Sequence, residues 1–315
     1  GGKQAIFHAL LATLDPGDEV LIPAPWWVSY PEIARFAGAT VVPLATDAAG
    51  GFRITAAQLE AAITPKTKWF IFNSPSNPTG AGYTRAELKG LTDVLMRHPQ
   101  VWVMSDDMYE HLVFDDFEFC TPAEIEPGLY DRTLTCNGVS KAYAMTGWRI
   151  GYAAGPKPLL TAMANIQSQS TSNPCSISQK AAVAALRLGN PFTTVMVAEF
   201  DRRRRLMVER LNKIPGVTCR MPTGAFYAFP NVSGLLAKRW KDQPIGTAAN
   251  LATYLLNEAQ VALVPGEPFG SDVIEWRDID ATKKFLDDQR PSRRGRARRV
   301  WCAPTSAWPV RSEEH

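Results

Sequence analysis

The feature that most constrains the fold is a regular alternation between short apolar runs and segments with helical spacing. Six apolar runs of strand length occupy residues 19–24, 39–44, 68–73, 101–106, 132–137 and 149–155. Between them, apolar residues recur every three or four positions, as in TRAELKGLTDVLMRH, which is typical of amphipathic helices. The alternation predicts an α/β fold with a mostly parallel sheet, helices on both faces, and ligands bound beyond the carboxyl ends of the strands.

After residue 155 the segments become longer and more helical, which predicts a second domain. We expect a large domain over residues 1–205, a bend near residue 205, and a smaller α+β domain over 206–290. The runs CRMPTGAFYAFP (219–230) and VALVPG (261–266) are predicted to be strands of the smaller domain. The chain opens without a methionine, directly on an amphipathic run, and we expect it to be the interior of a longer protein.

The net charge of +3 is concentrated at one end of the chain. Residues 291–315 hold six arginines and two glutamates, a net charge of +4, so that the rest of the chain is close to neutral. This segment has neither a helical nor a strand period and is predicted to be a disordered basic tail. The charge therefore gives no reason to expect nucleic acid as a partner.

The cysteines and histidines do not suggest a metal site. The five cysteines are scattered, without a CxxC pair, and there are only four histidines. Free thiols suit a reducing compartment, and no run of eighteen apolar residues is present for a membrane helix. We therefore expect a soluble, cytoplasmic protein that holds no metal and contacts no membrane.

Chemically useful side chains follow the predicted strands at the edge where a doubly wound sheet binds its ligands. They comprise a flat aromatic, an amide, a carboxylate, a phenol, a hydroxyl, a lysine and an arginine, at Trp27, Asn77, Asp106, Tyr109, Ser140, Lys141 and Arg149. Pyridoxal phosphate requires these groups: an amine for its aldehyde, a carboxylate for its ring nitrogen, donors for its ring oxygen and a cation for its phosphate. Gly1 and Gly2 precede a predicted helix, whose free N–H groups also suit an anion.

The motifs NSPSNPTG, SDDMYEHL and NGVSKAYAMTGWRIGY closely resemble those of class I aminotransferases of pyridoxal-phosphate fold type I. The opening GGKQAIFHALLATLDPGDEVLIPAPWWVSYPE is similar to the bacterial aspartate aminotransferase branch. The resemblance covers about residues 1–270. It identifies residues 1–205 as the cofactor-binding domain, lacking its N-terminal part.

The resemblance assigns a role to each matching residue. Lys141 is implied to form the Schiff base, Asp106 to pair with the pyridine nitrogen, and Tyr109 with Asn77 to donate to the ring oxygen. Trp27 is implied to stack on the ring, while Ser140, Arg149 and the backbone at Gly2 and Lys3 hold the phosphate. Lys3 is also implied to face the distal carboxylate of a dicarboxylic substrate.

The carboxylate clamp of the family matches this chain only loosely. In the family an arginine follows VPGxxFG, and here Arg277 fits that frame with a spacing one residue longer and aspartates where serine and tyrosine are expected. A surface helix position is an equal alternative for Arg277. Asp107 is interpreted as a solvated neighbour of Asp106. The segment DRRRR (201–205) is predicted to form the solvent-exposed face of a helix.

Three functions remain open at this point. The first is transamination between L-aspartate and 2-oxoglutarate by a ping-pong mechanism, with amino acids and 2-oxo acids as partners in a homodimer, or a related aromatic or prephenate-type activity. The second is a non-catalytic domain that binds pyridoxal phosphate. The third is an inactive remnant of such an enzyme that binds nothing. The resemblance favours the first.

Overall fold

The computed structural model describes residues 1–189 and 191–270. Six strands form one sheet with the order β2-β1-β3-β4-β5-β6, and all pairs are parallel except β5 with β6. The strands are β1 (Glu19–Ala24), β2 (Thr40–Ala45), β3 (Thr67–Asn73), β4 (Trp102–Asp106), β5 (Thr133–Gly138) and β6 (Gly151–Ala154). Each coincides with one of the six predicted runs, so the mostly parallel sheet is confirmed.

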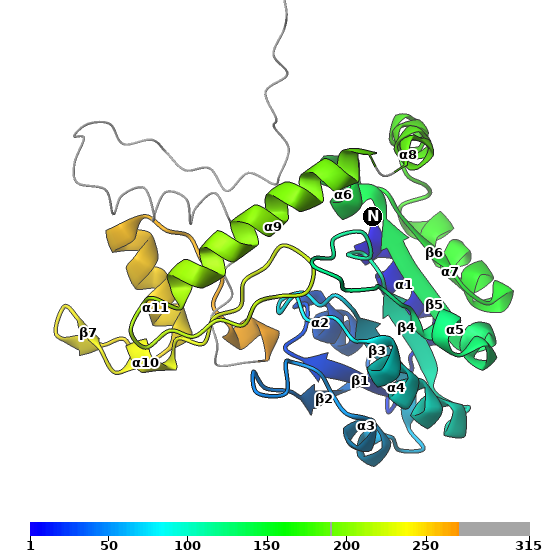
Figure 1. Ribbon diagram of the computed structural model, residues 1–315. Coiled ribbons are helices and arrows are strands. Elements are labelled where there is room, and N and C mark those ends of the chain that lie inside the picture. The colour runs from blue at the N-terminus through cyan, green and yellow to red at the C-terminus, as the bar shows by residue number, and fades with distance from the viewer. Residues whose placement is uncertain (190, 271–315) are drawn as a thin grey trace, which may run out of the picture.

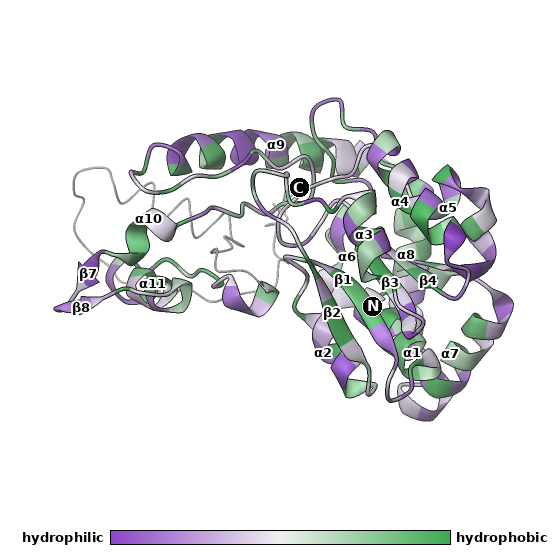
Figure 2. Ribbon diagram, turned by 90° about the horizontal axis from the view of Figure 1, so that it is seen from below, coloured by the Kyte–Doolittle hydropathy of each residue, from purple (hydrophilic) through white to green (hydrophobic). Residues whose placement is uncertain are grey.

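Helices cover both faces of this sheet, as predicted (Figure 1). One face carries α1 (Gly2–Thr13), α2 (Ser29–Phe36) and α7 (Lys157–Ser170), whose apolar side chains share a core with the sheet. The other face carries α3 (Ala56–Ala62), α4 (Arg85–Arg97), α5 (Pro122–Ile125) and η1 (Pro127–Arg132), around a second core. Figure 2 shows hydrophobic colouring along the central strands and hydrophilic colouring on the outer surfaces of several helices.

Local sequence explains these elements. In β3 every residue from Trp69 to Phe72 is buried, as expected of a strand between two helical layers. The helix α4 begins with a capping box in which Thr84 and Glu87 satisfy each other's backbone N–H groups. It then buries Leu88, Leu91 and Leu95 on one face, the spacing of an amphipathic helix.

The second part of the described chain is connected to the first by the long helix α9 (Pro191–Leu211), which spans the space between them (Figure 1). Its own core lies around Met207, Val217, Leu251 and Val261. The remaining elements are α6 (Val139–Ala142), η2 (Thr146–Trp148), α8 (Ser176–Leu188), α10 (Ser233–Leu236), β7 (Arg239–Trp240), β8 (Gln243–Pro244), α11 (Ala248–Tyr254), η3 (Leu255–Ala259) and η4 (Glu267–Phe269).

Three details of this part differ from the predictions. The helix α9 continues as one element to Leu211, through residue 205, where a bend and the start of the second domain were predicted. The runs 219–230 and 261–266 are not strands. Gly224, within the first run, forms an isolated bridge with Val113, and Thr218 and Asn231, which flank that run, form another. Pro222 and Pro230 have no N–H for a ladder, and Ala225 has a left-handed backbone with φ of 58°, so this segment cannot form an extended pair.

No single helix in the described part of the chain is long and apolar enough to cross a membrane. Within the same residues, no group of His, Cys, Asp and Glu is arranged to hold a metal ion. Cys120, Cys136 and Cys219 are buried free thiols, and Cys175 is exposed. The predicted tail at 291–315 lies outside the described residues.

Candidate active site

The carboxyl ends of β3, β4 and β5 bring three of the predicted residues to one edge of the sheet. Asp106 ends β4, and Lys141 follows β5 in the short helix α6. Asn73, at the end of β3, donates from Nδ2 to the carbonyl oxygen of Asp106 over 2.8 Å. Its Oδ1 accepts from the backbone N–H of Asn77 over 2.8 Å, so that one amide side chain links the Asn77 loop to β4.

Asp106 is a buried carboxyl group with a buried phenol as its partner. Tyr30 donates from its hydroxyl to Oδ2 of Asp106 over 2.5 Å, and the backbone N–H of Met108 donates to Oδ1 over 3.3 Å. Burial raises the pKa of Asp106, against the opposing effects of these two hydrogen bonds and of the Lys141 charge. Burial, and then the Asp106 charge, raise the pKa of Tyr30 well above its ordinary value, so Tyr30 stays a hydrogen-bond donor.

An aromatic side chain and a lysine lie beside this carboxyl group. The rings of Trp27 and Tyr30 meet edge to face, with centroids 5.2 Å apart. Lys3, in the first turn of α1, places its ammonium nitrogen 5.0 Å from the centroid of the Trp27 ring, within the range of a cation–π contact. The structure thus brings Trp27 and Lys3 to one place, as the sequence predicted.

Lys141 lies against aromatic rings. Its Nζ is 5.0 Å from the ring centroid of Phe226 and 6.0 Å from that of Tyr109. The hydroxyl groups of Tyr109 and Tyr227 form a short hydrogen bond with each other, and both side chains are buried. The charge of Lys141 opposes the rise in the pKa of Asp106 that burial causes.

The start of the chain lies against the loop that carries Arg149. The nitrogen of Gly1 donates to the carbonyl oxygen of Arg149 over 2.8 Å, so the N-terminal end of α1 lies beside that residue. Arg149 adopts a left-handed backbone with φ of 57° and donates from Nη1 to the carbonyl oxygen of Thr146 over 2.6 Å. A Cβ atom on Gly151 would lie 2.1 Å from the backbone nitrogen of Gly2, so only glycine permits this approach.

The interpretation of Asp107 as a solvated residue is wrong, and that of DRRRR as a solvent-exposed helix face is wrong at Arg204 alone, since Arg202 and Arg205 are exposed. Asp107 is 3% exposed and accepts a hydrogen bond from the hydroxyl of Ser105 over 2.6 Å. It lies on the opposite face from Asp106, and both faces are covered by helices. Arg204, within DRRRR, is 6% exposed and not on the wet face of α9. Its guanidinium pairs with Asp115 at 2.9 Å and with Asp201.

The other predicted site residues differ in how far the structure describes them. Ser140 is 7% exposed and lies in α6 beside Lys141. Arg277 lies outside the described residues, and its role as a carboxylate clamp stays a prediction.

Sequence reasoning missed Tyr30, Asn73, Phe226 and Tyr227. Asn73 ends a predicted strand at the ligand edge, and Tyr30 lies three residues after Trp27, between two predicted strands, so both could have been found from their positions. Phe226 and Tyr227 come from a segment far along the chain that was interpreted as a strand. No periodicity in that segment points toward Lys141.

The residues at this edge fit pyridoxal phosphate. The side-chain oxygen of Asn77 is buried and has no hydrogen-bond partner among the described residues, which is costly for an amide unless a ligand satisfies it. The glycine contact between Gly2 and Gly151 leaves the N–H groups at the start of α1 beside Arg149, an arrangement suited to a phosphate. Lys141 and Asp106 supply the amine and the carboxyl group that the aldehyde and the ring nitrogen require.

The sheet and this site together define a domain of pyridoxal-phosphate fold type I. Residues 1–277 match the family described as aminotransferase class I and II. The solved aspartate aminotransferase of Rhizobium meliloti has a TM-score of 0.85 and 51% identity, over 91% of this chain and 73% of that one. The Thermus thermophilus aspartate aminotransferase with maleate has a TM-score of 0.80 and 39% identity, over 91% of this chain and 73% of that one.

The chain belongs to the class I and II aminotransferases. It is 64% identical over 271 residues to the aspartate/prephenate aminotransferase of Cereibacter sphaeroides, covering 86% of this chain and 68% of that protein. It is 55% identical over 271 residues to an aspartate aminotransferase of Rhizobium meliloti, covering 86% of this chain and 66% of that protein. The chain thus spans about two thirds of the length of these curated relatives.

Proposed function

We propose that this protein transfers the amino group of L-aspartate to 2-oxoglutarate, giving oxaloacetate and L-glutamate, with pyridoxal phosphate as its cofactor. The observation that carries the proposal is the placement of Asp106 at the end of β4 and of Lys141 directly after β5, with Nζ of Lys141 6.0 Å from the ring centroid of Tyr109. The two relatives named above, an aspartate/prephenate and an aspartate aminotransferase, support aspartate as the amino donor.

Each residue has a distinct task in this proposal. When bound, pyridoxal phosphate supplies an electron-withdrawing ring that takes up the electron pair released at the substrate Cα. Lys141 binds the aldehyde carbon in the resting enzyme and, once the substrate has displaced it, accepts the proton from Cα on Nζ. Asp106 holds a proton on the ring nitrogen, and Tyr30 fixes the orientation of its carboxyl group through the 2.5 Å hydrogen bond.

The remaining residues bind and orient. Tyr109 and Asn77 hydrogen-bond the ring oxygen, Trp27 covers the ring, and Arg149, Ser140 and the N–H groups at the start of α1 bind the phosphate. We assign Lys3 to the distal carboxylate of the substrate and Arg277 to the proximal one. The solved Thermus thermophilus relative with maleate, a dicarboxylate, supports a dicarboxylic substrate.

A prephenate-type acceptor is a second candidate, because the Cereibacter sphaeroides relative is named for both aspartate and prephenate. Both acceptors carry a second carboxylate that Lys3 could bind, and they differ in the ring that prephenate carries in its distal half. Assays of the same preparation with each acceptor at equal concentration distinguish them.

We also propose a homodimer. In the described chain, α8 and α9 expose large apolar side chains, including Ile177 at 70%, Leu188 at 76% and Val195 at 72%. Apolar side chains gathered in this way support a protein partner, and light scattering during gel filtration measures whether that partner is a second copy. A cytoplasmic location stays a prediction.

The function is tested by adding pyridoxal phosphate to the purified chain and following visible absorption before and after L-aspartate. Oxaloacetate is then measured with 2-oxoglutarate present. We expect a cofactor band that L-aspartate changes, with turnover that requires the 2-oxo acid. Lys141→Ala should abolish both.

Lys157→Ala is the matched control, because Lys157 is an exposed lysine at the start of α7 and should leave both signals unchanged. A cofactor band without turnover would support a non-catalytic binding domain instead. The absence of any band that depends on Lys141 would contradict the proposal.

A further inference from the structure

One segment from the second half of the chain covers Lys141, and we name residues 222–228 the roof segment. It is tied to the sheet-bearing part by backbone hydrogen bonds at three positions. The N–H groups of Thr223 and Gly224 both donate to Gly80, and that of Ala225 donates to Leu112 over 2.7 Å. Ala225 is fully buried with φ of 58°, so the turn that aims the next two side chains is fixed by the backbone.

The two aromatic residues after this turn face the predicted cofactor-binding residues. Phe226 lies with its ring centroid 5.0 Å from Nζ of Lys141. Tyr227 packs edge to face on Tyr109, with centroids 5.6 Å apart and an interplanar angle of 76°. Their hydroxyl groups share a hydrogen bond, and the side chains are 4% exposed at Tyr109 and 6% exposed at Tyr227.

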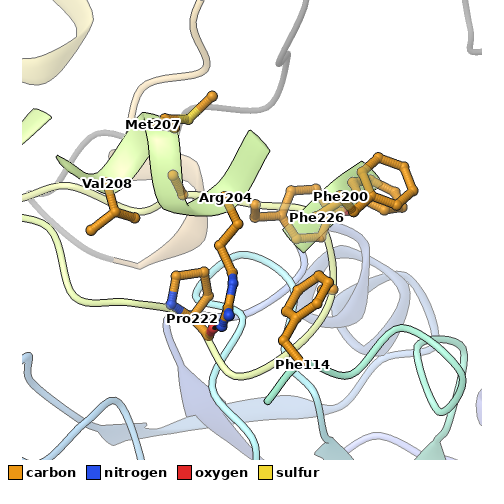
Figure 3. A pocket seen from close by; sticks show the side chains of 10 residues that line it. Phe114, Phe200, Arg204, Met207, Val208, Pro222 and Phe226 are labelled. Carbon is orange, nitrogen blue, oxygen red and sulfur yellow. Dashed lines mark hydrogen bonds between the residues drawn. The ribbon is translucent and has the colours of Figure 1, made fainter. Parts of the chain in front are cut away.

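The roof segment is also held from its other side. Figure 3 shows Arg204 reaching from α9 toward Pro222 and Phe114. Its Nη1 donates to the carbonyl oxygen of Pro222 over 2.6 Å, and the guanidinium lies 4.5 Å from the ring centroid of Phe114. The ring of Phe226 stacks on Phe200 of α9, with centroids 5.4 Å apart. Tyr227 therefore meets Tyr109 from a fixed position.

We propose that Tyr227 is a positioning residue that acts through Tyr109. A phenol hydroxyl has one hydrogen and can rotate about its C–O bond. Either hydroxyl can donate in this pair, and the proposal assigns the donor to Tyr227, which turns the hydrogen of Tyr109 away from Tyr227 and toward the ring oxygen of the cofactor. The proposal deepens and rests on the proposed function, because it requires Tyr109 to serve that ring oxygen.

The arrangement has a measurable consequence for the bond between Lys141 and the cofactor. The nitrogen that would join Lys141 to the cofactor can lose a proton. The deprotonated state leaves more negative charge on the ring oxygen, and a hydrogen bond from Tyr109 would stabilise that charge. Losing a donor to the oxygen should therefore raise the pH at which the visible absorption changes. Because a hydrogen bond contributes modestly in net terms, we expect Tyr227→Phe to raise this midpoint by about 0.5 to 1 pH unit and to weaken cofactor binding about 3- to 10-fold.

The experiment is a pH titration of the visible spectrum of the chain loaded with pyridoxal phosphate, in four variants. Tyr109→Phe should raise the midpoint at least as far as Tyr227→Phe. The double variant should match Tyr109→Phe alone, because Tyr227 acts only through Tyr109. Tyr83→Phe is the matched control, since Tyr83 is a buried tyrosine whose hydroxyl accepts from the backbone of Ile54 over 2.8 Å; its loss should leave the midpoint unchanged.

A midpoint that Tyr227→Phe leaves in place, or shifts that add fully in the double variant, would overturn the proposal. If Tyr227 has only a structural role, Tyr227→Phe should lower the free energy of unfolding, as is expected of Tyr83→Phe, and should leave the midpoint of the pH titration unchanged.

A second measurement needs no cofactor. In the chain with ¹³Cζ-labelled tyrosine, Tyr227→Phe should move the Tyr109 resonance, which Tyr109→Phe identifies, and Tyr83→Phe should not. If the parent chain takes up no cofactor, the proposed function fails. In that case the Tyr109 resonance alone tests whether Tyr227 is hydrogen-bonded to Tyr109. If Tyr227→Phe does not move this resonance, the hydrogen bond between the two tyrosines is rejected too.

Discussion

At the scale of single residues, the site depends on buried groups that fix other buried groups. Tyr30 and Asp106 illustrate this: neither is a surface residue, and their 2.5 Å hydrogen bond is the contact that orients the carboxyl group toward the ligand edge. A carboxyl group in such surroundings is sensitive to each donor it loses.

Tyr30→Phe should therefore impair the enzyme without disturbing the fold. A hydrogen bond to an ionised group contributes about 1.5 to 3 kcal/mol, so we expect kcat to fall roughly 10- to 100-fold and the pKa of Asp106 to rise further. Steady-state kinetics with aspartate and 2-oxoglutarate measure the effect. Tyr254→Phe, in the separate core of the second part of the chain, is the control, and equal losses in both variants would contradict this account.

The buried carboxyl group of Asp107 should make the free energy of unfolding depend on pH. Burial raises its pKa from 3.8 to about 7, against the hydrogen bonds from Ser105 and Thr121. A raised pKa favours the protonated form, so the contribution to stability is fully present below about pH 4 and is lost as the pH rises through about 7. Asp107→Asn stays neutral, and its advantage over the parent should grow from near zero at about pH 4 to roughly 2 to 4 kcal/mol at about pH 8.

Urea unfolding of the parent and of Asp107→Asn across this pH range measures the difference in the free energy of unfolding. The result to look for is a difference that depends on pH. A constant difference would mean that the pKa of Asp107 is the same in the folded and the unfolded protein, and would contradict the prediction.

The residue scale also shows what the sequence could predict. Asp106, Asn77 and Lys141 follow strands of a parallel sheet, and position alone brought them to one edge. Asp107 was predicted to be a solvated neighbour of Asp106, which is wrong because it is 3% exposed. In a sheet covered on both faces, alternate side chains reach two buried layers, so burial of Asp107 follows from the predicted fold itself.

At the scale of elements, the close approach of α1 to β6 fixes the phosphate end of the site. The approach depends on Gly151, where a Cβ atom would meet the backbone of Gly1 and Gly2 at 2.1 to 2.6 Å. Backbone atoms cannot move aside as a flexible side chain can, so one of the two elements must shift.

Gly151→Ala should destabilise the fold by about 2 to 4 kcal/mol, in line with overpacking of a tight contact, and should weaken binding of pyridoxal phosphate at least 10-fold. Gly147→Ala is the matched control, because a Cβ atom there would meet nothing within 4 Å and Gly147 lies in the same loop region. Thermal unfolding and cofactor titration of both variants check the prediction. Similar behaviour of the two variants would show that the contact is not needed.

The strands and helices of the sheet were predictable from period and capping residues, whereas the segment 219–230 was not. Its apolar composition resembles that of a strand, but Pro222, Pro230 and the left-handed Ala225 prevent a ladder. The shape of this segment is set by contacts with Gly80 and Leu112, which are more than a hundred residues away in the chain. Local patterns carry no information about such contacts.

At the scale of the whole molecule, one buried arginine joins the two parts of the described chain. Arg204 lies in α9 and pairs with Asp201 of the same helix and with Asp115, which follows β4 in the sheet-bearing part. It also holds the roof segment through Pro222. Since its side chain is only 4% exposed, its removal leaves the carbonyl oxygen of Pro222 without this buried donor.

Arg204→Met should lower the free energy of unfolding by about 2 to 4 kcal/mol. Breaking a fully buried ion pair costs up to about 5 kcal/mol, and the loss here should be smaller because both aspartates are partly exposed. Arg205→Met is a close control: Arg205 pairs with the same two aspartates, yet its side chain is 55% exposed, and exposed pairs contribute about 0 to 1 kcal/mol. Urea unfolding of both variants compares a buried and an exposed arginine with shared partners. Because Arg204 also fixes the roof segment, Arg204→Met should weaken binding of pyridoxal phosphate and Arg205→Met should not. Equal effects of the two substitutions would mean that charge alone, and not the buried connection between the two parts, is what Arg204 provides.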